Sequence, residues 1–223
     1  MIQKTAVFKS FILPAIDSSQ IWRLTGSTVV CFVCWALLAK LFKLLFFSNA
    51  TTLELISGNT KTGMLFILLS FWGLLLGTFL ITKLNKRSFR SLFGTEYRLK
   101  KYFSITFILC FLFGLVSTCL IINIGKNELI YNSYYLVWIT SLIWGLPLLF
   151  VQVVAEEVFF RGYLVQQLAA KYNSFLVWMI LPSLAFGFAH YDSEAYGSSS
   201  LLIVGLLTCY GIFSIDLTRR TGN

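Results

Sequence analysis

Long apolar stretches separated by short polar connections dominate the chain from residue 28 onwards. Stretches of about 17–25 apolar residues are long enough, as helices, to cross the roughly 30 Å hydrocarbon layer of a bilayer. The short alternating segments of a membrane β-barrel do not occur. The pattern predicts an all-α, polytopic transmembrane helical bundle with about six spans, at Thr28–Phe47, Thr62–Thr82, Tyr102–Ile124, Tyr135–Val154, Ser174–His190 and Leu201–Leu217.

Charged residues lie among apolar ones at the ends of two predicted spans and in the N-terminal segment. Lys40 and Lys43 fall in the last turns of the first span, where long side chains reach the interface. The fourth span is predicted to continue as a helix to about Lys171. Residues 1–26 mix charged and apolar positions without a cleavage site, so we expect an amphipathic segment on the membrane surface. The expected organisation is 1–134 for this segment and three spans, and 135–223 for the remainder.

Composition and charge agree with a multi-pass protein of the cell membrane, in contact with the lipid bilayer. Of the residues, 57% are hydrophobic and 12% are charged. Soluble domains have about 25% charged residues. The net charge of +9 does not indicate nucleic-acid binding, because no basic run is interleaved with exposed aromatics. A cytoplasmic N-terminus instead places most of the 18 basic residues inside, including the cluster between spans two and three: Lys83, Lys86, Arg87, Arg90, Arg98, Lys100 and Lys101, against Glu96.

Two of the nine acidic residues, Glu156 and Glu157, are adjacent near the inner end of the fourth span. Carboxylates in or near hydrocarbon are costly and mark functional sites. Glu157 and Arg161 have i, i+4 spacing, which predicts an ion pair on one helix face. Glu156 lies about 100° around the helix, so we expect it to face an interior cavity as a general base.

His190 is the only histidine, and it follows Phe186 by four residues at the end of the fifth span. Imidazole binds metals and exchanges protons at neutral pH, so His190 with a carboxylate is a minimal set for activating water. Each polar residue alone also fits an interfacial position with no chemistry. Their coincidence on consecutive helices favours a site.

The run Ala155–Gly162 resembles the EExxxR motif of the CAAX-protease and bacteriocin-processing family (CPBP, or Abi) of intramembrane endopeptidases, and Phe186–His190 resembles its FxxxH motif. The resemblance covers Tyr135–Asn223. It implies hydrolysis of a membrane-embedded or membrane-associated peptide or protein. Glu156 would activate water, and His190 would bind that water or a metal. Glu157, Arg161 and Phe186 would support the site.

The resemblance also implies zinc or another divalent metal held by Glu156 and His190, with a metal-free glutamate mechanism left open. The family's third motif, HxxxN, would follow residues like Arg220–Asn223, where this sequence stops. One histidine and one or two carboxylates fall short of the three protein ligands of catalytic zinc.

Three hypotheses therefore stand. The first is an endopeptidase, of the smaller kind found in bacterial plasma membranes, acting in bacteriocin, signal-peptide or immunity processing. The second is a non-catalytic immunity or partner-binding protein of the same family. The third is a proton-conducting transporter, for which inverted repeats would be expected and none is found.

Overall fold

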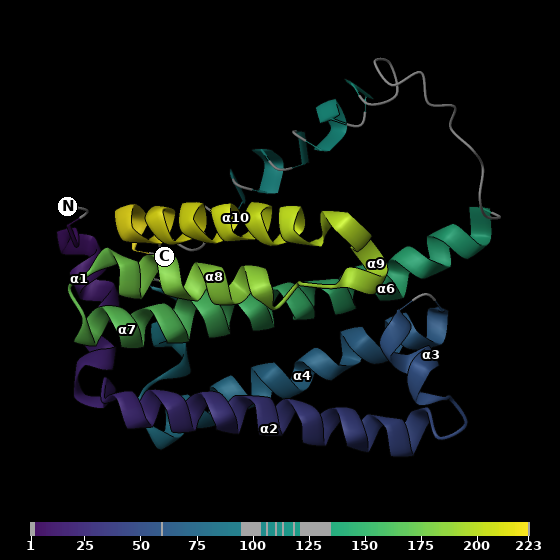
Figure 1. Ribbon diagram of the computed structural model, residues 1–223, viewed down its shortest axis with the longest axis horizontal. Coiled ribbons are helices and arrows are strands. Elements are labelled where there is room, and N and C mark those ends of the chain that lie inside the picture. The colour runs from purple at the N-terminus through teal and green to yellow at the C-terminus, as the bar shows by residue number, and fades with distance from the viewer. Residues whose placement is uncertain are drawn as a thin grey trace.

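The computed structural model describes residues 3–58, 60–94 and 135–222, together with short pieces between 104 and 120 (104–105, 107–109, 111–112, 114–117 and 119–120). Every regular element in these ranges is a helix (Figure 1). Four helical stretches are long and apolar enough to cross a membrane: Ile21–Phe46, Lys61–Leu84, Ile139–Lys171 and Ser193–Thr221. Two shorter apolar helices are Phe107–Ser117 and Leu176–Phe188. The predicted all-α membrane bundle is confirmed.

The helices follow the predicted spans closely, with one early start. The described elements are α1 (Ala6–Ile12), η1 (Leu13–Ser18), α2 (Ile21–Phe46), α3 (Thr52–Ser57), α4 (Lys61–Leu84), η2 (Phe89–Phe93), α6 (Tyr135–Glu156), η3 (Glu157–Leu164), α7 (Val165–Lys171), η4 (Leu176–Ile180), α8 (Leu181–Phe188), α9 (Ser193–Tyr196), η5 (Gly197–Ser199) and α10 (Ser200–Thr221). Helix α2 begins at Ile21 rather than Thr28, and hydroxyls in its first turns bond to the helix's own carbonyls: Thr25 to Ile21 at 3.0 Å and Thr28 to Leu24 at 2.9 Å. Much of the predicted third span, Tyr102–Ile124, lies outside the described residues, as do Glu96, Arg98, Lys100, Lys101 and Asn223.

Helices α2 and α4 pack side by side along their length (Figure 1). Their contact is closest at Gly73 and Gly77, which are four residues apart on α4. A Cβ atom on Gly77 would lie only 2.8 Å from the Cα of Cys31. Small residues at this spacing let membrane helices approach through their backbones.

A second close contact joins α8 to α10. A Cβ on Gly187 of α8 would lie 2.6 Å from the carbonyl oxygen of Val204, and it would also meet the hydroxyl of Thr208. Nearby on α10, Gly211 packs in the same way against Ser183 of α8. Helix α10 therefore fixes the position of α8, the helix that precedes His190.

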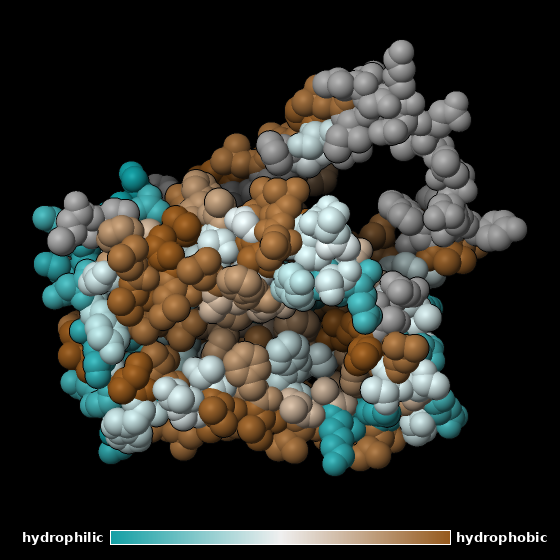
Figure 2. All heavy atoms as spheres, viewed as in Figure 1, coloured by the Kyte–Doolittle hydropathy of each residue, from teal (hydrophilic) through white to brown (hydrophobic). Residues whose placement is uncertain are grey.

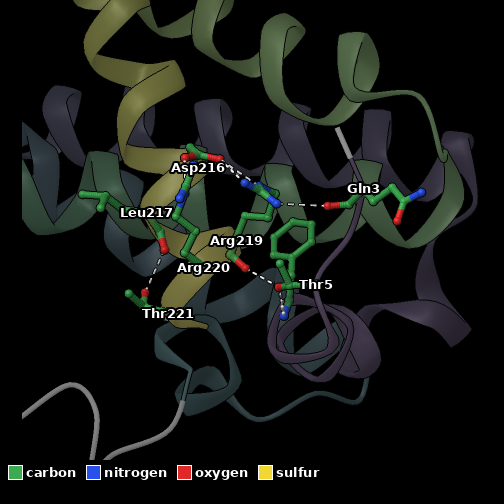
Figure 3. Close-up of polar contacts among 8 residues, drawn as sticks. Gln3, Thr5, Asp216, Leu217, Arg219, Arg220 and Thr221 are labelled. Atoms are coloured by element: carbon green, nitrogen blue, oxygen red, sulfur yellow. Dashed lines mark hydrogen bonds and ion pairs between the residues drawn. The ribbon is translucent and has the colours of Figure 1, made fainter. Parts of the chain in front are cut away.

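The N-terminal segment, which we expect to be amphipathic, packs one of its faces into the protein. Phe8 is fully buried, with its ring 5.1 Å from that of Trp178. Figure 3 shows the segment bound to the end of α10: the hydroxyl of Thr5 donates to the carbonyl of Arg219, and Arg219 Nη1 donates to the carbonyl of Gln3 at 3.1 Å. Leu13 stays 65% exposed, so the other face remains open to the surroundings. Amphipathicity predicts an apolar face but not whether lipid or protein covers it.

The surface agrees with a bilayer environment. Figure 2 shows apolar residues across the middle of one face, with hydrophilic residues gathered at the end where α1 lies and around α3. Large apolar side chains such as Leu84 and Leu136 are among the most exposed. A soluble monomer rarely exposes so much contiguous apolar surface, whereas a multi-pass membrane protein presents it to lipid.

Candidate active site

The helix predicted to run through the double glutamate to Lys171 is present, but its hydrogen bonding changes at Glu157. Residues Glu157–Leu164 form a π-helix, η3, which the apolar pattern did not predict. Its last bond runs from the Val165 amide to the carbonyl of Phe160, five residues back. Such segments are rare and are frequent at functional sites. Gly162 lies within η3, and its missing Cβ lets Leu92 of η2 approach to 3.2 Å of that position.

The predicted ion pair between Glu157 and Arg161 is confirmed. The Arg161 side chain is almost entirely buried, while Glu157 is about one-third exposed. Nε and Nη2 of Arg161 have no hydrogen-bond partner among the described residues. The guanidinium instead packs against two neighbouring aromatic rings, 4.8 Å from the centre of Phe186 and 4.7 Å from that of Tyr210. A carboxylate and two cation–π contacts therefore stabilise this buried cation.

Phe186 of the FxxxH pattern packs directly against residues of the EExxxR segment. It is 5% exposed and packs edge-to-face against Phe160 of η3, with ring centres 5.3 Å apart. On its other side it contacts the ring of His190 at 4.7 Å. One side chain therefore contacts both Arg161 and His190, which gives the phenylalanine of the FxxxH pattern a definite structural role.

His190 has a defined orientation and tautomer. Its Nδ1 lies 2.8 Å from the carbonyl oxygen of Phe186. Because a carbonyl only accepts, Nδ1 must carry the proton in this bond, and the lone pair is then on Nε2. The partly buried ring therefore presents Nε2 as the atom able to bind water or a metal.

Glu156 and His190 are related through the two arms of a helical hairpin. The arm α6–η3–α7 turns at residues 172–175 into the arm η4–α8, and Phe160 of the first contacts Phe186 of the second. One turn further from the hairpin, Glu156 precedes Phe160 by four residues and His190 follows Phe186 by four. This register predicts a similar depth for the two residues on the two arms. Gln152 Nε2 donates to Glu156 Oε1 at 3.1 Å, and Glu156 lies within electrostatic range of Arg161.

A cavity of about 750 Å³ adjoins the ion pair. Its described walls come from α1, η2, α6, η3, the end of α10 and Ser104, and they are mostly apolar: Phe11, Leu92, Phe93, Ser104, Phe150, Val153, Val154, Glu157, Val158, Arg161, Gly162, Ser214, Leu217 and Thr218. Glu156 is not among them, although we expected it to face an interior cavity. The wall residues from Phe150 to Arg161 recur every three or four positions, so they form one helix face with Glu157, while Glu156 shares the neighbouring face with Gln152.

The residues present do not by themselves fit a complete catalytic zinc site. In the described parts of the chain, no three residues of the His, Cys, Asp and Glu types are grouped so that they could hold a metal ion. Glu156 and His190 offer two donors, one fewer than the three protein ligands of catalytic zinc.

Tyr210 is the contributor that the sequence interpretation missed. It comes from α10, and its ring lies next to that of Phe186, with 6.3 Å between the ring centres, so that both rings contact the Arg161 guanidinium. The available signal was a tyrosine in the middle of an apolar span, away from the interfacial positions that tyrosine prefers.

The family model described as type II CAAX prenyl endopeptidase Rce1-like matches residues 136–223. The matched region begins one residue after the predicted boundary at Tyr135, contains every predicted site residue, and confirms the resemblance to the CPBP family. No curated protein and no solved structure matches the chain.

Proposed function

We propose, from the Rce1-like similarity of residues 136–223, that this multi-pass membrane protein is an intramembrane endopeptidase that hydrolyses a peptide bond in a membrane-associated protein or peptide. The observation that carries the proposal is that Phe186, within the matched region, contacts both His190 and Phe160, the residue four positions after Glu156. A carboxylate and an imidazole brought together in this way are the groups needed to bind and deprotonate water.

In the proposed reaction, Glu156 is the general base. Gln152 donates to Oε1, which leaves Oε2 to accept a proton from a water molecule. The Nε2 lone pair of His190 accepts a hydrogen bond from the same water and orients it. The water oxygen attacks the scissile carbonyl carbon, and the resulting tetrahedral intermediate collapses when Glu156 returns its proton to the leaving amine.

The ion pair of Glu157 with Arg161 has a positioning role in this scheme. Arg161 is held by a carboxylate on its own helix and by rings on α8 and α10. It therefore joins the three elements that must keep Glu156 and His190 in register. Misplacement of catalytic groups by about 1 Å is enough to cost on the order of 10² in rate.

The adjoining cavity is the proposed position for the apolar part of the substrate. Its apolar walls, interrupted by one carboxylate and one guanidinium, suit a hydrophobic or lipid-bearing segment whose polar backbone approaches Glu157 and Arg161. A substrate anchored in the bilayer could enter it laterally without leaving the membrane.

The expected divalent metal can be tested by chelation. Treatment with a chelator followed by gel filtration should abolish activity, and added Zn²⁺ should restore it, if a metal completes the site. Activity that survives the treatment unchanged would support the glutamate mechanism without metal.

The central test is cleavage of a membrane-anchored reporter peptide by the purified chain in proteoliposomes, with products identified by mass spectrometry. Glu156→Gln and His190→Gln should each lower the rate by about 10²–10⁴. Glu54→Gln removes a carboxylate from α3, outside the site, and should leave the rate unchanged. Cleavage that is undiminished in Glu156→Gln would overturn the proposal. Partner binding that persists in this variant without any cleavage by the native chain would favour the non-catalytic hypothesis.

A further inference from the structure

A second hollow, of about 610 Å³, lies away from the site, where α2 begins and α4 ends. Three cationic side chains line it, Arg23, Lys86 and Arg87, and they outnumber the carboxylate of Asp17. Its remaining described walls include Val30 and Ile81, along which the hollow meets the apolar sides of both helices. The hollow is therefore cationic at one end and apolar at the other.

Backbone hydrogen bonds at the end of α4 fix the main chain of Lys86 and Arg87. The Lys86 amide donates to the carbonyl of Lys83, and the Arg87 amide donates to the carbonyl of Thr82 five residues back. Lys86 itself adopts a left-handed conformation with φ of 56°. This is a Schellman motif, in which the left-handed position is usually glycine. This chain has a lysine at that position, among the residues that line the hollow, despite the conformational cost.

Arg87 is the strongest indication of a ligand. Its side chain is only 7% exposed, yet Nε and Nη1 have no hydrogen-bond partner among the described residues. Nη2 donates to the side-chain oxygen of Gln166, which fixes the guanidinium plane. Burial lowers the pKa of Arg87, because the guanidinium loses solvent that its protein surroundings do not fully replace. Buried cationic donors without acceptors are costly, so an anionic acceptor is the expected occupant.

We propose that this hollow binds the phosphate of an anionic phospholipid headgroup from the leaflet on the side of the N-terminus. The unpartnered Nε and Nη1 lie on different edges of the guanidinium, so the phosphate accepts a charge-assisted hydrogen bond from one of them. The Trp22 side chain is 68% exposed, and its ring centre lies 5.1 Å from the Arg23 guanidinium. Tryptophan concentrates at the level of the headgroups, so this ring places the rim of the hollow there. The apolar end of the hollow then receives the start of an acyl chain. The proposal is independent of the proposed proteolysis.

The test is a lipid titration of the full chain in detergent, with bound lipid counted by native mass spectrometry. Dioleoyl-phosphatidylglycerol should bind more tightly than dioleoyl-phosphatidylcholine, which has the same chains and no net charge. The double variant Arg23→Gln/Lys86→Gln should weaken phosphatidylglycerol binding by about fivefold for each charge removed. Arg90→Gln removes one charge from the same loop outside the hollow and should change binding by less than twofold. This pair of variants avoids Arg87, whose loss would disturb Gln166 and the fold.

Three results would overturn the proposal. One is equal affinity for the two lipids. Another is equal weakening of binding, per charge, by the Arg90 and the Arg23/Lys86 substitutions, because only the general surface charge would then matter. The third is binding of inorganic phosphate alone at the same affinity as the lipid, which would identify a soluble anion as the ligand. Displacement of the lipid by phosphate only at far higher concentration is the expected result.

Discussion

Gly187→Ala is the substitution whose effect can be worked out most directly from the contacts of α8 with α10. The new Cβ would lie 2.6 Å from the carbonyl oxygen of Val204, a backbone atom that cannot rotate away. Ordinary van der Waals contact begins at 3.4 Å, so the two helices must separate by about 0.8 Å at this point. Overpacking of this kind costs about 1–3 kcal/mol. The gain from alanine in a helix interior offsets about 0.5–1 kcal/mol, so the expected net loss of stability is about 1–2 kcal/mol.

The same displacement should reach the proposed site, because His190 follows Gly187 by three residues. Separation of α8 from α10 by nearly 1 Å should lower the cleavage rate by up to about 10², although neither Glu156 nor His190 is changed. Reversible unfolding in mixed micelles measures the stability, and reporter cleavage in proteoliposomes measures the rate.

Gly205→Ala is the matched control, since this α10 glycine has nothing within 4 Å of the would-be Cβ. It should be neutral or slightly stabilising and should leave cleavage unchanged. Addition of Thr208→Ala to Gly187→Ala should restore part of the stability, because it removes the clash with the side-chain hydroxyl but not the one with the backbone. Equal effects of Gly187→Ala and Gly205→Ala would refute the close-packed interface.

Substitutions at three further positions test the rest of the structure. Glu157→Gln leaves the buried Arg161 without its counter-charge; it should lower stability by about 2 kcal/mol in denaturant titrations, and an unchanged midpoint would argue against the pair. Tyr210→Phe keeps the ring over Arg161; it should be neutral, while Tyr210→Leu should cost about 1 kcal/mol in the same titrations, and equal losses would show that the hydroxyl matters and not the ring. Phe8→Ala removes the contact with Trp178; it should cost about 3 kcal/mol, whereas an α1 lying on the lipid surface would lose far less.

The sequence was sufficient for those features that depend on local spacing. The apolar lengths located the membrane helices, and i, i+4 spacing paired Glu157 with Arg161. The hairpin could also be anticipated, because a short polar turn between apolar helices makes them antiparallel neighbours. The family pattern then drew attention to Phe186 and His190 together.

Other features depend on contacts between distant segments, which spacing does not encode. Nothing local in the sequence distinguishes Gly187, in contact with α10, from Gly205, which has open space beside it. Phe8 and Tyr210 acquire their roles only when the N-terminal segment and α10 pack against the other helices. The π-helix was not predicted for a different reason. Its hydrogen bonds span five residues instead of four, and this change leaves the overall hydropathy of the segment unchanged.

The π-helix also has a consequence for the direction in which side chains point along its helix. The proposed site at Glu156 and the buried amide of Gln166, which binds Arg87 and the carbonyls of Phe11 and Ser91, lie on one continuous helix on either side of η3. The wide turn of η3 sets the angular phase between them. Deletion of one residue within it would shorten the span by that residue alone, yet with otherwise unchanged winding it would rotate one end against the other by about 100°. The π-helix therefore sets the direction in which Glu156 points when Gln166 is bound to its partners.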